Sequence, residues 1–258
     1  MDNILNRTFY HNSFPKSFEE KNFNVPIYRI IPFYRLLEIL KTNQLYVSQT
    51  IQWEDTYENF LAKSNFKWGK IPITYANFLP CFYGQCWSLS KETDALWRIY
   101  SLDKCSVRIK TTICKLLSSS CNEPNYIDFS TKIRIVGKVT YFSKEQLAKW
   151  VNNENKGIIS EATLRESLFL KRKEFSHEKE VRLVINKTID REDEFNGLQR
   201  KGIILNITSN DFIDEVMFDP RISNTEYETY LYTLKKIGYQ NKISKSNLYN
   251  FLPLEIIK

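Results

Sequence analysis

An alternation of apolar and charged residues runs through residues 178–185 and predicts a β-strand. Apolar residues occupy one side of this strand, and Glu178, Glu180 and Arg182 share the other. A rise of about 3.3 Å per residue places the two carboxylates roughly 7 Å apart on one face. Three charges on one side of a strand are usual on a solvated face, and they also suit a functional site. The pattern alone leaves both interpretations open.

Two other predicted strands carry polar residues where a purely structural core would not. In residues 25–31, Arg29 shares a face with two isoleucines. An arginine in that setting most often extends its head to the sheet margin, whereas a buried one needs a partner such as a bound phosphate. In residues 81–90, Ser88 and Ser90 share one face with a cysteine. Such small residues are typical of an exposed strand, and they also let a ligand approach the backbone.

The remaining periodic segments complete a pattern of helices and strands. Ser143 with Gln146 and Ser223 with Glu226 form capping boxes, which predict the starts of two helices. Helices are expected at residues 33–40, 93–100, 143–151, 160–173 and 223–238, and further strands at residues 45–47, 105–110, 132–142 with a break at Gly137, 202–207, 215–218 and 239–244.

The chain shows no internal repeat and no linker that would divide it. Residues 1–24 lack periodicity and are expected to form an irregular lead-in. Of the 258 residues, 42% are hydrophobic and 14% are aromatic, which indicates a globular protein. We therefore predict that residues 25–258 form a single α+β domain, with mixed or antiparallel sheets and packed helices.

Composition limits the kinds of ligand and cellular setting that we expect for this protein. With 7 glycines and no glycine-rich phosphate-binding motif, the chain lacks the usual nucleotide-binding loop. A formal net charge of +7 favours an anionic partner such as nucleic acid. The five cysteines include no C-x-x-C pair and only two histidines are present, so we expect reduced thiols in the cytoplasm and no metal site. No apolar run approaches the roughly 20 residues that cross a membrane, and we expect a soluble protein.

Several motifs together resemble those of the bacterial domain-of-unknown-function family 2971. The matching segments are Tyr28-Arg29, Leu45-Tyr46-Val47-Ser48, the acidic residues 55–58, Cys86-Trp87-Ser88, residues 96–101, Glu178-Lys179-Glu180-Val181-Arg182 and residues 215–220. The glutamate-x-glutamate-x-arginine strand is the most specific of them. Thr56 stands where the family usually has proline, and Asp219 stands where it often has glycine. These departures make the acidic motif the weakest part of the match.

The order of arginine, serine and glutamate along three strands also resembles the ADP-ribosyltransferase fold, which has a split-sheet core. This resemblance implies NAD as a substrate. It implies that Arg29 holds the NAD phosphates or ribose and that Ser88 and Ser90 support the nicotinamide ribose. By the same resemblance, Trp97 or Tyr100 lies near the nicotinamide ring.

The resemblance further implies that Glu180 is the catalytic glutamate and that Glu178 orients the acceptor. Cleavage of the nicotinamide glycosidic bond develops an oxocarbenium-like sugar, as glycoside hydrolysis does. A carboxylate fixed beside the ribose stabilises this charge as it forms, which accelerates the reaction. The leading hypothesis is therefore an NAD-dependent transferase that modifies a macromolecule, with toxin or anti-phage defence effector as its biological role.

Charge gives a slight preference for nucleic acid, RNA or DNA, over protein as the acceptor. Lys171, Arg172 and Lys173 form a basic cluster at the end of the predicted helix 160–173. We expect this cluster to contact phosphates on a basic rim beside the site. Lysine-rich helix ends are also common without any ligand, because cations favour helix C-termini.

Two other functions fit the sequence. A Mg²⁺-dependent nuclease could use Asp55, Glu58, Glu178 and Glu180, although Arg182 replaces the lysine that usually follows a nuclease carboxylate. A non-catalytic binding or regulatory domain of a defence system would use the tryptophans as core and the glutamates as a solvated face.

Overall fold

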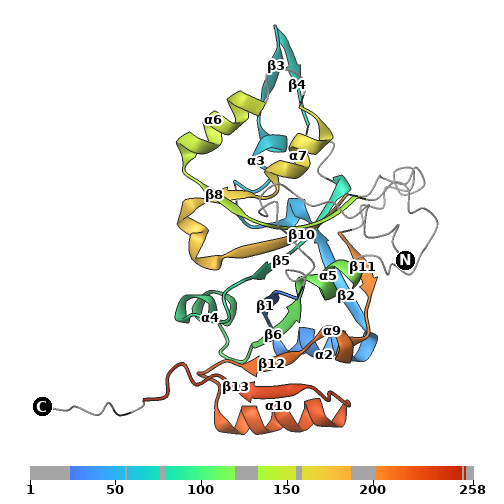
Figure 1. Ribbon diagram of the computed structural model, residues 1–258, viewed down its shortest axis with the longest axis vertical. Coiled ribbons are helices and arrows are strands. Elements are labelled where there is room, and N and C mark those ends of the chain that lie inside the picture. Colours follow the sequence, from blue (N-terminus) through green and yellow to red (C-terminus); the bar gives the residue numbers. More distant parts are fainter. Residues whose placement is uncertain are drawn as a thin grey trace, which may run out of the picture. The chain divides into compact units, whose positions relative to one another are not determined.

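The computed structural model describes residues 24–55, 57–75, 80–119, 133–154, 159–186, 201–251 and 253 (Figure 1). The predicted lead-in lies almost entirely outside these residues, and Thr56 lies outside them as well. The chain forms two compact units, each assembled from separate segments. Unit 1 comprises Met1–Ile27, Leu45–Leu89 and Thr112–Asn206, and unit 2 comprises Tyr28–Gln44, Ser90–Thr111 and Ile207–Lys258. The single domain expected from the sequence stays a prediction.

The main strands of unit 1 surround β10 (Glu180–Asn186). β10 pairs antiparallel with β5 (Phe82–Ser88) on one edge and with β7 (Ile133–Lys138) on the other. β2 (Gln44–Gln49) pairs antiparallel with the far edge of β5, and β11 (Gly202–Asn206) pairs with β2. Every residue of β10 is buried, although its alternating sequence predicts a strand buried on one face. Its charged side chains therefore need partners inside the protein.

Short helices and two small sheets complete unit 1. The helices are η2 (Thr50–Gln52), α3 (Phe60–Lys63), α5 (Ile113–Ser119), α6 (Lys144–Glu154), α7 (Glu161–Ser167) and η4 (Lys173–Glu178). β3 (Phe66–Trp68) and β4 (Ile71–Ile73) form a hairpin that extends from the unit (Figure 1). β8 (Thr140–Phe142) and β9 (Leu170–Arg172) pair in parallel. A buried apolar cluster joins α3, α7, β5, β7 and β10, and it includes Leu61, Phe82, Ile135, Leu164, Phe169 and Val184.

Unit 2 contains four strands and four helices among its described residues. The strands β1 (Pro26–Ile31), β6 (Val107–Thr112), β12 (Glu215–Phe218) and β13 (Lys242–Lys245) lie in this order. β12 is antiparallel to β6 and parallel to β13. The helices are α2 (Phe33–Thr42), α4 (Asp94–Tyr100), α9 (Ser209–Phe212) and α10 (Asn224–Lys236). The ring of Phe33 stacks on Tyr230 with centroids 3.9 Å apart, which packs α2 against α10.

The predicted α+β class with mixed sheets is confirmed, because antiparallel and parallel pairs occur together with packed helices. Both capping boxes are confirmed as well. The backbone N–H of Gln146 donates to Ser143 Oγ at 3.2 Å, and that of Glu226 donates to Ser223 Oγ at 3.2 Å. The capping boxes depend on neighbours along the chain, which is why sequence patterns locate them.

Two predicted boundaries around the most specific motif are wrong. The helix expected at residues 160–173 ends at Ser167, because the chain leaves it to pair β9 with β8. The strand expected from Glu178 begins at Glu180. Lys179 has φ 45° and ψ 52°, a left-handed conformation that cannot continue a strand. Glu178 therefore ends the 3₁₀ helix η4 and does not belong to β10.

The break predicted at Gly137 also falls elsewhere. Gly137 remains in β7 and lies opposite Arg182 of β10. The interruption comes at Val139, whose backbone N–H donates to the carbonyl of Glu180 at 2.9 Å. A glycine within a strand often marks a bulge, but here it continues the ladder beside a large buried side chain.

Gly84 of β5 provides a first test of packing in unit 1. A methyl group added there would overlap the indole ring of Trp53 and lie 3.2 Å from Thr50 Cγ2. We expect Gly84→Ala to lower the free energy of unfolding by about 1–3 kcal/mol, the usual cost of overpacking. Chemical denaturation monitored by fluorescence measures this loss.

Gly202→Ala is a suitable control for that measurement. Its added methyl group would meet the ring of Tyr46, which is 50% exposed and can rotate into solvent. The loss at Gly202 should therefore be smaller than at Gly84. Equal losses at both positions would contradict tight packing around Trp53.

Candidate active site

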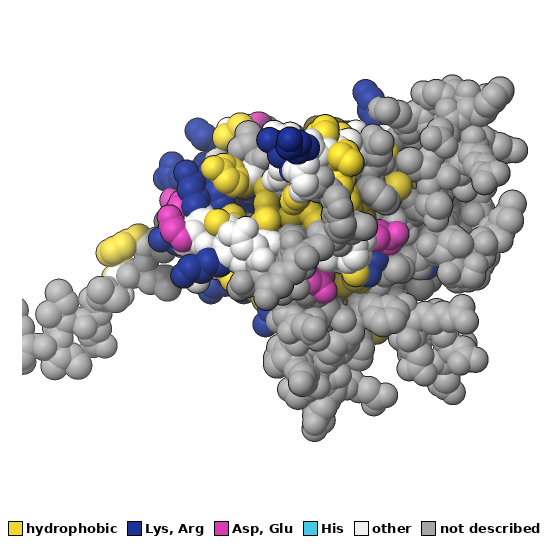
Figure 2. Space-filling view, turned by 90° about the horizontal axis from the view of Figure 1, so that it is seen from above, with side chains coloured by type: hydrophobic (Ala, Val, Ile, Leu, Met, Phe, Trp, Pro, Cys, Tyr) yellow, Lys and Arg dark blue, Asp and Glu magenta, His cyan; other side chains and the backbone are white. Residues whose placement is uncertain are grey.

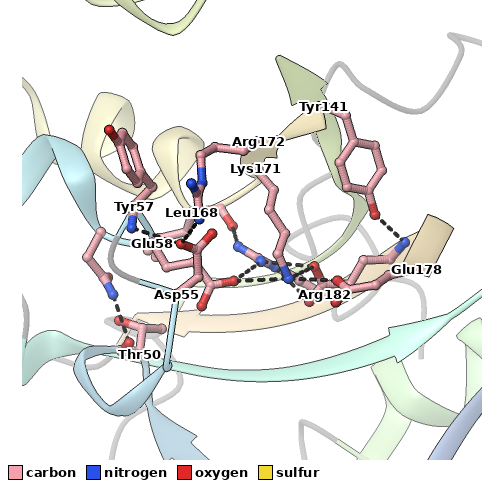
Figure 3. Close-up of polar contacts among 12 residues, drawn as sticks. Thr50, Asp55, Tyr57, Glu58, Tyr141, Leu168, Lys171, Arg172, Glu178 and Arg182 are labelled. Atoms are coloured by element: carbon pink, nitrogen blue, oxygen red, sulfur yellow. Dashed lines mark hydrogen bonds and ion pairs between the residues drawn. The ribbon is translucent and has the colours of Figure 1, made fainter. Parts of the chain in front are cut away.

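Arg182 is the centre of a buried ionic cluster in unit 1 (Figure 3). Its side chain is 0% exposed, and its Nε and Nη2 donate to the two carboxylate oxygens of Glu180 at 3.1 and 2.9 Å. Nη2 also donates to Glu58 at 2.5 Å, and Nη1 donates to the carbonyl of Leu168 at 2.5 Å. The guanidinium carbon lies 4.4 Å from the centroid of the Trp53 ring. Arg182 thus ties β10 to three other segments of the chain.

Lys171 is the second cation of this cluster. It lies on β9 and its side chain is 8% exposed. Its ammonium nitrogen lies 2.6 Å from a carboxylate oxygen of Glu178, 3.4 Å from one of Glu180 and 3.5 Å from one of Glu58. Three carboxylates therefore share two cations in a buried setting.

The left-handed residue Lys179 allows two glutamates to reach the same ammonium. Glu178 precedes this turn and Glu180 follows it. The end of β5 holds the turn in place, since Ser88 Oγ donates to the carbonyl of Glu178 at 2.6 Å. The backbone N–H of Leu89 donates to the carbonyl of Lys179 at 2.9 Å. Ser88 also lies directly opposite Glu180 in the strand register.

The surrounding charges set the protonation state of the cluster. Burial acts to raise the pKa of Glu180, but Arg182 and Lys171 outweigh burial and lower its pKa below the ordinary value. For Glu58 burial outweighs the same two cations, and its pKa is raised. Burial acts to lower the pKa of Lys171, but the glutamates around it raise it overall. Glu180 is consequently an ionised carboxylate at neutral pH.

Two further side chains contact Glu180. The Tyr141 hydroxyl accepts a hydrogen bond from the backbone N–H of Glu180 at 2.8 Å, and burial raises the pKa of Tyr141 to about 12. The thiol of Cys86 is hydrogen-bonded to the Glu180 carboxylate, and burial raises the pKa of Cys86 well above its usual range. Both groups are neutral at physiological pH, so Cys86 is a hydrogen-bond donor here and not a nucleophile.

The structure brings together three of the residues that the sequence selected, namely Ser88, Glu178 and Glu180. Sequence reasoning assigned no site role to Arg182, although the glutamate-x-glutamate-x-arginine motif contains it. Lys171 was assigned to nucleic acid and not to this cluster. The contacts of both cations depend on residues distant in sequence, which explains why local patterns did not reveal them.

The other predicted NAD-binding residues belong to unit 2. Trp97 is 0% exposed, and its indole N–H donates to Glu92 at 3.0 Å. Tyr100 is 46% exposed, whereas Arg29 and Ser90 are half-buried. The NAD-binding roles of Arg29, Ser90, Trp97 and Tyr100 remain predictions.

The basic cluster differs from the exposed helix end expected from the sequence. Lys171 is buried among glutamates, so it does not lie on an exposed rim. Arg172 is half-buried and its Nη2 donates to Asp55 at 2.9 Å. Lys173, the first residue of η4, is exposed. The helix prediction failed because β9 replaces its last turn, and strand alternation then sends neighbouring side chains in different directions.

The carboxylates expected to bind Mg²⁺ in a nuclease do lie close together. Glu58, Glu178 and Glu180 share the ammonium of Lys171, while Asp55 pairs with Arg172. Within the part of the chain that the structure describes, no group of histidine, cysteine and acidic residues has a geometry suited to a metal ion. Lys171 and Arg182 instead form ion pairs with Glu58, Glu178 and Glu180.

Two further expectations concern the thiols and the membrane. Cys81, Cys86, Cys105 and Cys114 form no disulfide with one another, and the fifth cysteine lies outside the described residues. None of the helices described is long and apolar enough to span a bilayer.

Comparisons with known proteins add the following findings. A family model described as "Protein of unknown function (DUF2971)" matches residues 96–183, which confirms the family resemblance over that stretch. No curated protein matches the chain.

Solved structures of Thermus sp. 2.9 DarT are similar to this chain at 13% sequence identity. The complex with NAD+ has a TM-score of 0.38, and the likeness covers 86% of this chain and 96% of that chain. The complex with carba-NAD+ has a TM-score of 0.37 with the same coverage. The complex with ADP-ribosylated ssDNA has a TM-score of 0.38 and covers 86% of this chain and 94% of that chain. At such low similarity, these ligands are properties of DarT.

Proposed function

We propose that this protein is an ADP-ribosyltransferase-like enzyme that cleaves NAD at its nicotinamide glycosidic bond and transfers ADP-ribose to a macromolecule. The observation that carries the proposal is the buried cluster around Glu180, in which three carboxylates share two cations. The ionised carboxylate of Glu180 in this cluster suits a reaction in which positive charge develops on a sugar.

Preorganisation is the physical advantage of such a cluster. Arg182 holds both oxygens of the Glu180 carboxylate, and Cys86 adds a hydrogen bond. A carboxylate fixed in this way needs no reorganisation when the oxocarbenium ion forms, and its effect is strongest where water is excluded. The adjacent Glu178 is available to orient the attacking group.

The remaining roles come from the resemblance to ADP-ribosyltransferases. Arg29 would bind the NAD phosphates or ribose through charge-assisted hydrogen bonds. Ser88 and Ser90 would support the nicotinamide ribose, with Trp97 or Tyr100 near the nicotinamide ring. The acceptor we favour is nucleic acid, DNA or RNA, because the net charge is +7.

A non-catalytic binding domain is the second candidate. Glu180 is 5% exposed and its carboxylate is paired, which is also what a purely structural ion network would show. The Mg²⁺-dependent nuclease is the third candidate, favoured by the convergence of Glu58, Glu178 and Glu180.

One set of assays separates these candidates. The purified protein is incubated with NAD, and nicotinamide release is measured together with transfer of labelled ADP-ribose to DNA, RNA and protein. Parallel reactions contain Mg²⁺ and labelled nucleic acid without NAD. Nicotinamide release indicates the transferase, whereas cleavage that requires Mg²⁺ alone indicates the nuclease. If neither reaction occurs with any acceptor, the binding domain replaces the proposed function.

Glu178→Gln tests whether Glu178 orients the acceptor while Glu180 acts in cleavage of the glycosidic bond. If Glu178 orients the acceptor, this variant should lose transfer by about 10²-fold or more, the scale of losing general-base assistance, while slow hydrolysis of NAD survives. Labelled transfer and nicotinamide release are measured in the same reaction. Glu228→Gln, at an exposed position of α10, is the control and should leave both rates unchanged. Equal losses of transfer and hydrolysis at Glu178 would contradict an acceptor-specific role.

A further inference from the structure

Arg172 is held between two aromatic rings at the surface of unit 1. Its guanidinium carbon lies 4.5 Å from the centroid of the Tyr57 ring and 5.1 Å from that of Phe175. Asp55 fixes the guanidinium through the 2.9 Å ion pair with Nη2 (Figure 3). A planar guanidinium stacks well on aromatic faces, and we call these side chains the Tyr57–Arg172–Phe175 stack.

This stack continues into the ionic cluster around Glu180. The ammonium of Lys171 lies 4.8 Å from the centroid of the Phe175 ring. The same ammonium lies 2.6 Å from Glu178 and 3.4 Å from Glu180. A ligand seated on the stack would therefore approach the carboxylates that we propose to act in transfer.

Two exposed lysines lie beside the outer end of the stack. The ammonium of Lys144 is 5.8 Å from the centroid of the Tyr57 ring, and Tyr57 is 37% exposed. Lys173 follows Arg172 in the chain and is exposed. The parallel pairing of Phe142 with Arg172 brings the start of α6 next to the start of η4. Both lysines consequently lie on the same side of unit 1.

We propose that the Tyr57–Arg172–Phe175 stack, together with Lys144 and Lys173, binds single-stranded nucleic acid. The exposed ring of Tyr57 offers a stacking surface for a base, and the two lysines offer contacts for phosphates. Figure 2 shows Lys and Arg side chains next to exposed hydrophobic ones on the face of the molecule that it draws. A duplex keeps its bases stacked within the helix and cannot use the ring in this way. Only the role of the bound strand as acceptor rests on the proposed function.

Two exposed acidic residues act against this binding and provide a test of opposite sign. Glu145 follows Lys144, and Glu174 follows Lys173. A hydrogen bond from Ser143 lowers the pKa of Glu145, and the nearby charges of Lys173 and Lys144 add to this effect. Glu145 is thus ionised close to both lysines. Glu145→Gln should strengthen binding, because it removes a negative charge near the expected phosphate positions.

The central experiment measures binding by fluorescence anisotropy without NAD, using labelled single-stranded DNA, single-stranded RNA and the same DNA as a duplex. Tyr57→Ala should raise the dissociation constant for single strands by about 5- to 160-fold, the range found when a stacked base loses its aromatic partner. Tyr57→Phe keeps the ring and should stay within about twofold of the wild type. Replacing Lys144 and Lys173 with alanine should reduce the slope of log K against log salt by about 0.7 for each lysine.

Tyr232 is the matched control. It is 62% exposed, Lys236 lies 5.8 Å from its ring centroid, and it belongs to unit 2. Tyr232→Ala should leave binding unchanged. The proposal is overturned if the wild type does not bind single strands, if duplex binds equally well, or if Tyr57→Ala resembles Tyr232→Ala. Thermal unfolding of each variant identifies any loss of binding that follows from loss of structure, and Tyr57→Phe then decides the case.

The outcome for this surface is distinguishable from the outcome for the proposed function. Binding that depends on Tyr57 without any nicotinamide release would support the surface and reject the transferase. Nicotinamide release with nucleic-acid transfer that is unaffected by Tyr57→Ala would support the transferase and reject the surface.

Discussion

Replacing Glu180 with glutamine is expected to reduce NAD turnover by roughly 10²-fold or more, the scale of losing one preorganised electrostatic partner. Glutamine keeps the shape of the side chain and can still hydrogen-bond a ribose hydroxyl. It lacks the negative charge that an oxocarbenium-like sugar requires, so NAD affinity should change little while the chemical step slows. Nicotinamide release under saturating NAD measures the rate, and a direct binding measurement with NAD gives the affinity.

Glu215→Gln is the matched control for this experiment. Glu215 also begins a buried strand and also pairs with an arginine and a lysine, Arg108 and Lys242. It should lose stability through the same kind of ion-pair disruption and keep its NAD turnover. If Glu180→Gln turns over NAD as fast as wild type, the catalytic role of Glu180 is wrong, and the buried cluster is structural.

Features that depend on chain neighbours were predictable from the sequence. The capping boxes at Ser143 and Ser223 need a partner only three residues away, and both form as expected. The predicted strand at residues 215–218 matches β12, because its hydrophobic run is flanked by polar and turn residues. In the site, the motif containing Glu178 and Glu180 was found because both carboxylates lie within one short segment.

Features that depend on distant segments were not predictable. The sequence pattern predicts that the side of β10 with Glu180 and Arg182 is either solvated or functional. Nothing in the neighbouring residues decides between these two interpretations. Glu58 and Lys171, which come from other segments, contact this side and bury it. The left-handed turn at Lys179 was also missed, since lysine has no local preference for that conformation. A tertiary constraint, the hydrogen bonds from the end of β5, holds this turn.

The largest expected effect on stability is at Arg182. Arg182→Met should lower the free energy of unfolding by about 3–5 kcal/mol, because Glu58 and Glu180 would remain buried with only Lys171 to neutralise them. A typical domain is stable by about 5–15 kcal/mol, so the variant should remain measurable under stabilising conditions. Urea unfolding at neutral pH measures the loss. A loss below about 1 kcal/mol would mean that the buried carboxylates do not depend on Arg182 for their stabilisation.

A second substitution and a change of pH identify uncompensated charge as the cause. Adding Glu58→Gln to Arg182→Met removes one of the carboxylates left without its arginine, so the double variant should be more stable than Arg182→Met alone.

In the wild type, the lowered pKa of Glu180 contributes stability at pH values above the pKa that this carboxyl has in the unfolded chain, and this contribution is lost as pH falls. In Arg182→Met, burial without the arginine should instead raise the pKa of Glu180, so acid should favour the folded variant. The difference in stability between wild type and Arg182→Met should therefore shrink as pH falls from neutral towards about 4, near the pKa of an unperturbed glutamate. A difference that stays constant over this range would indicate lost packing against Trp53 rather than unpaired charge.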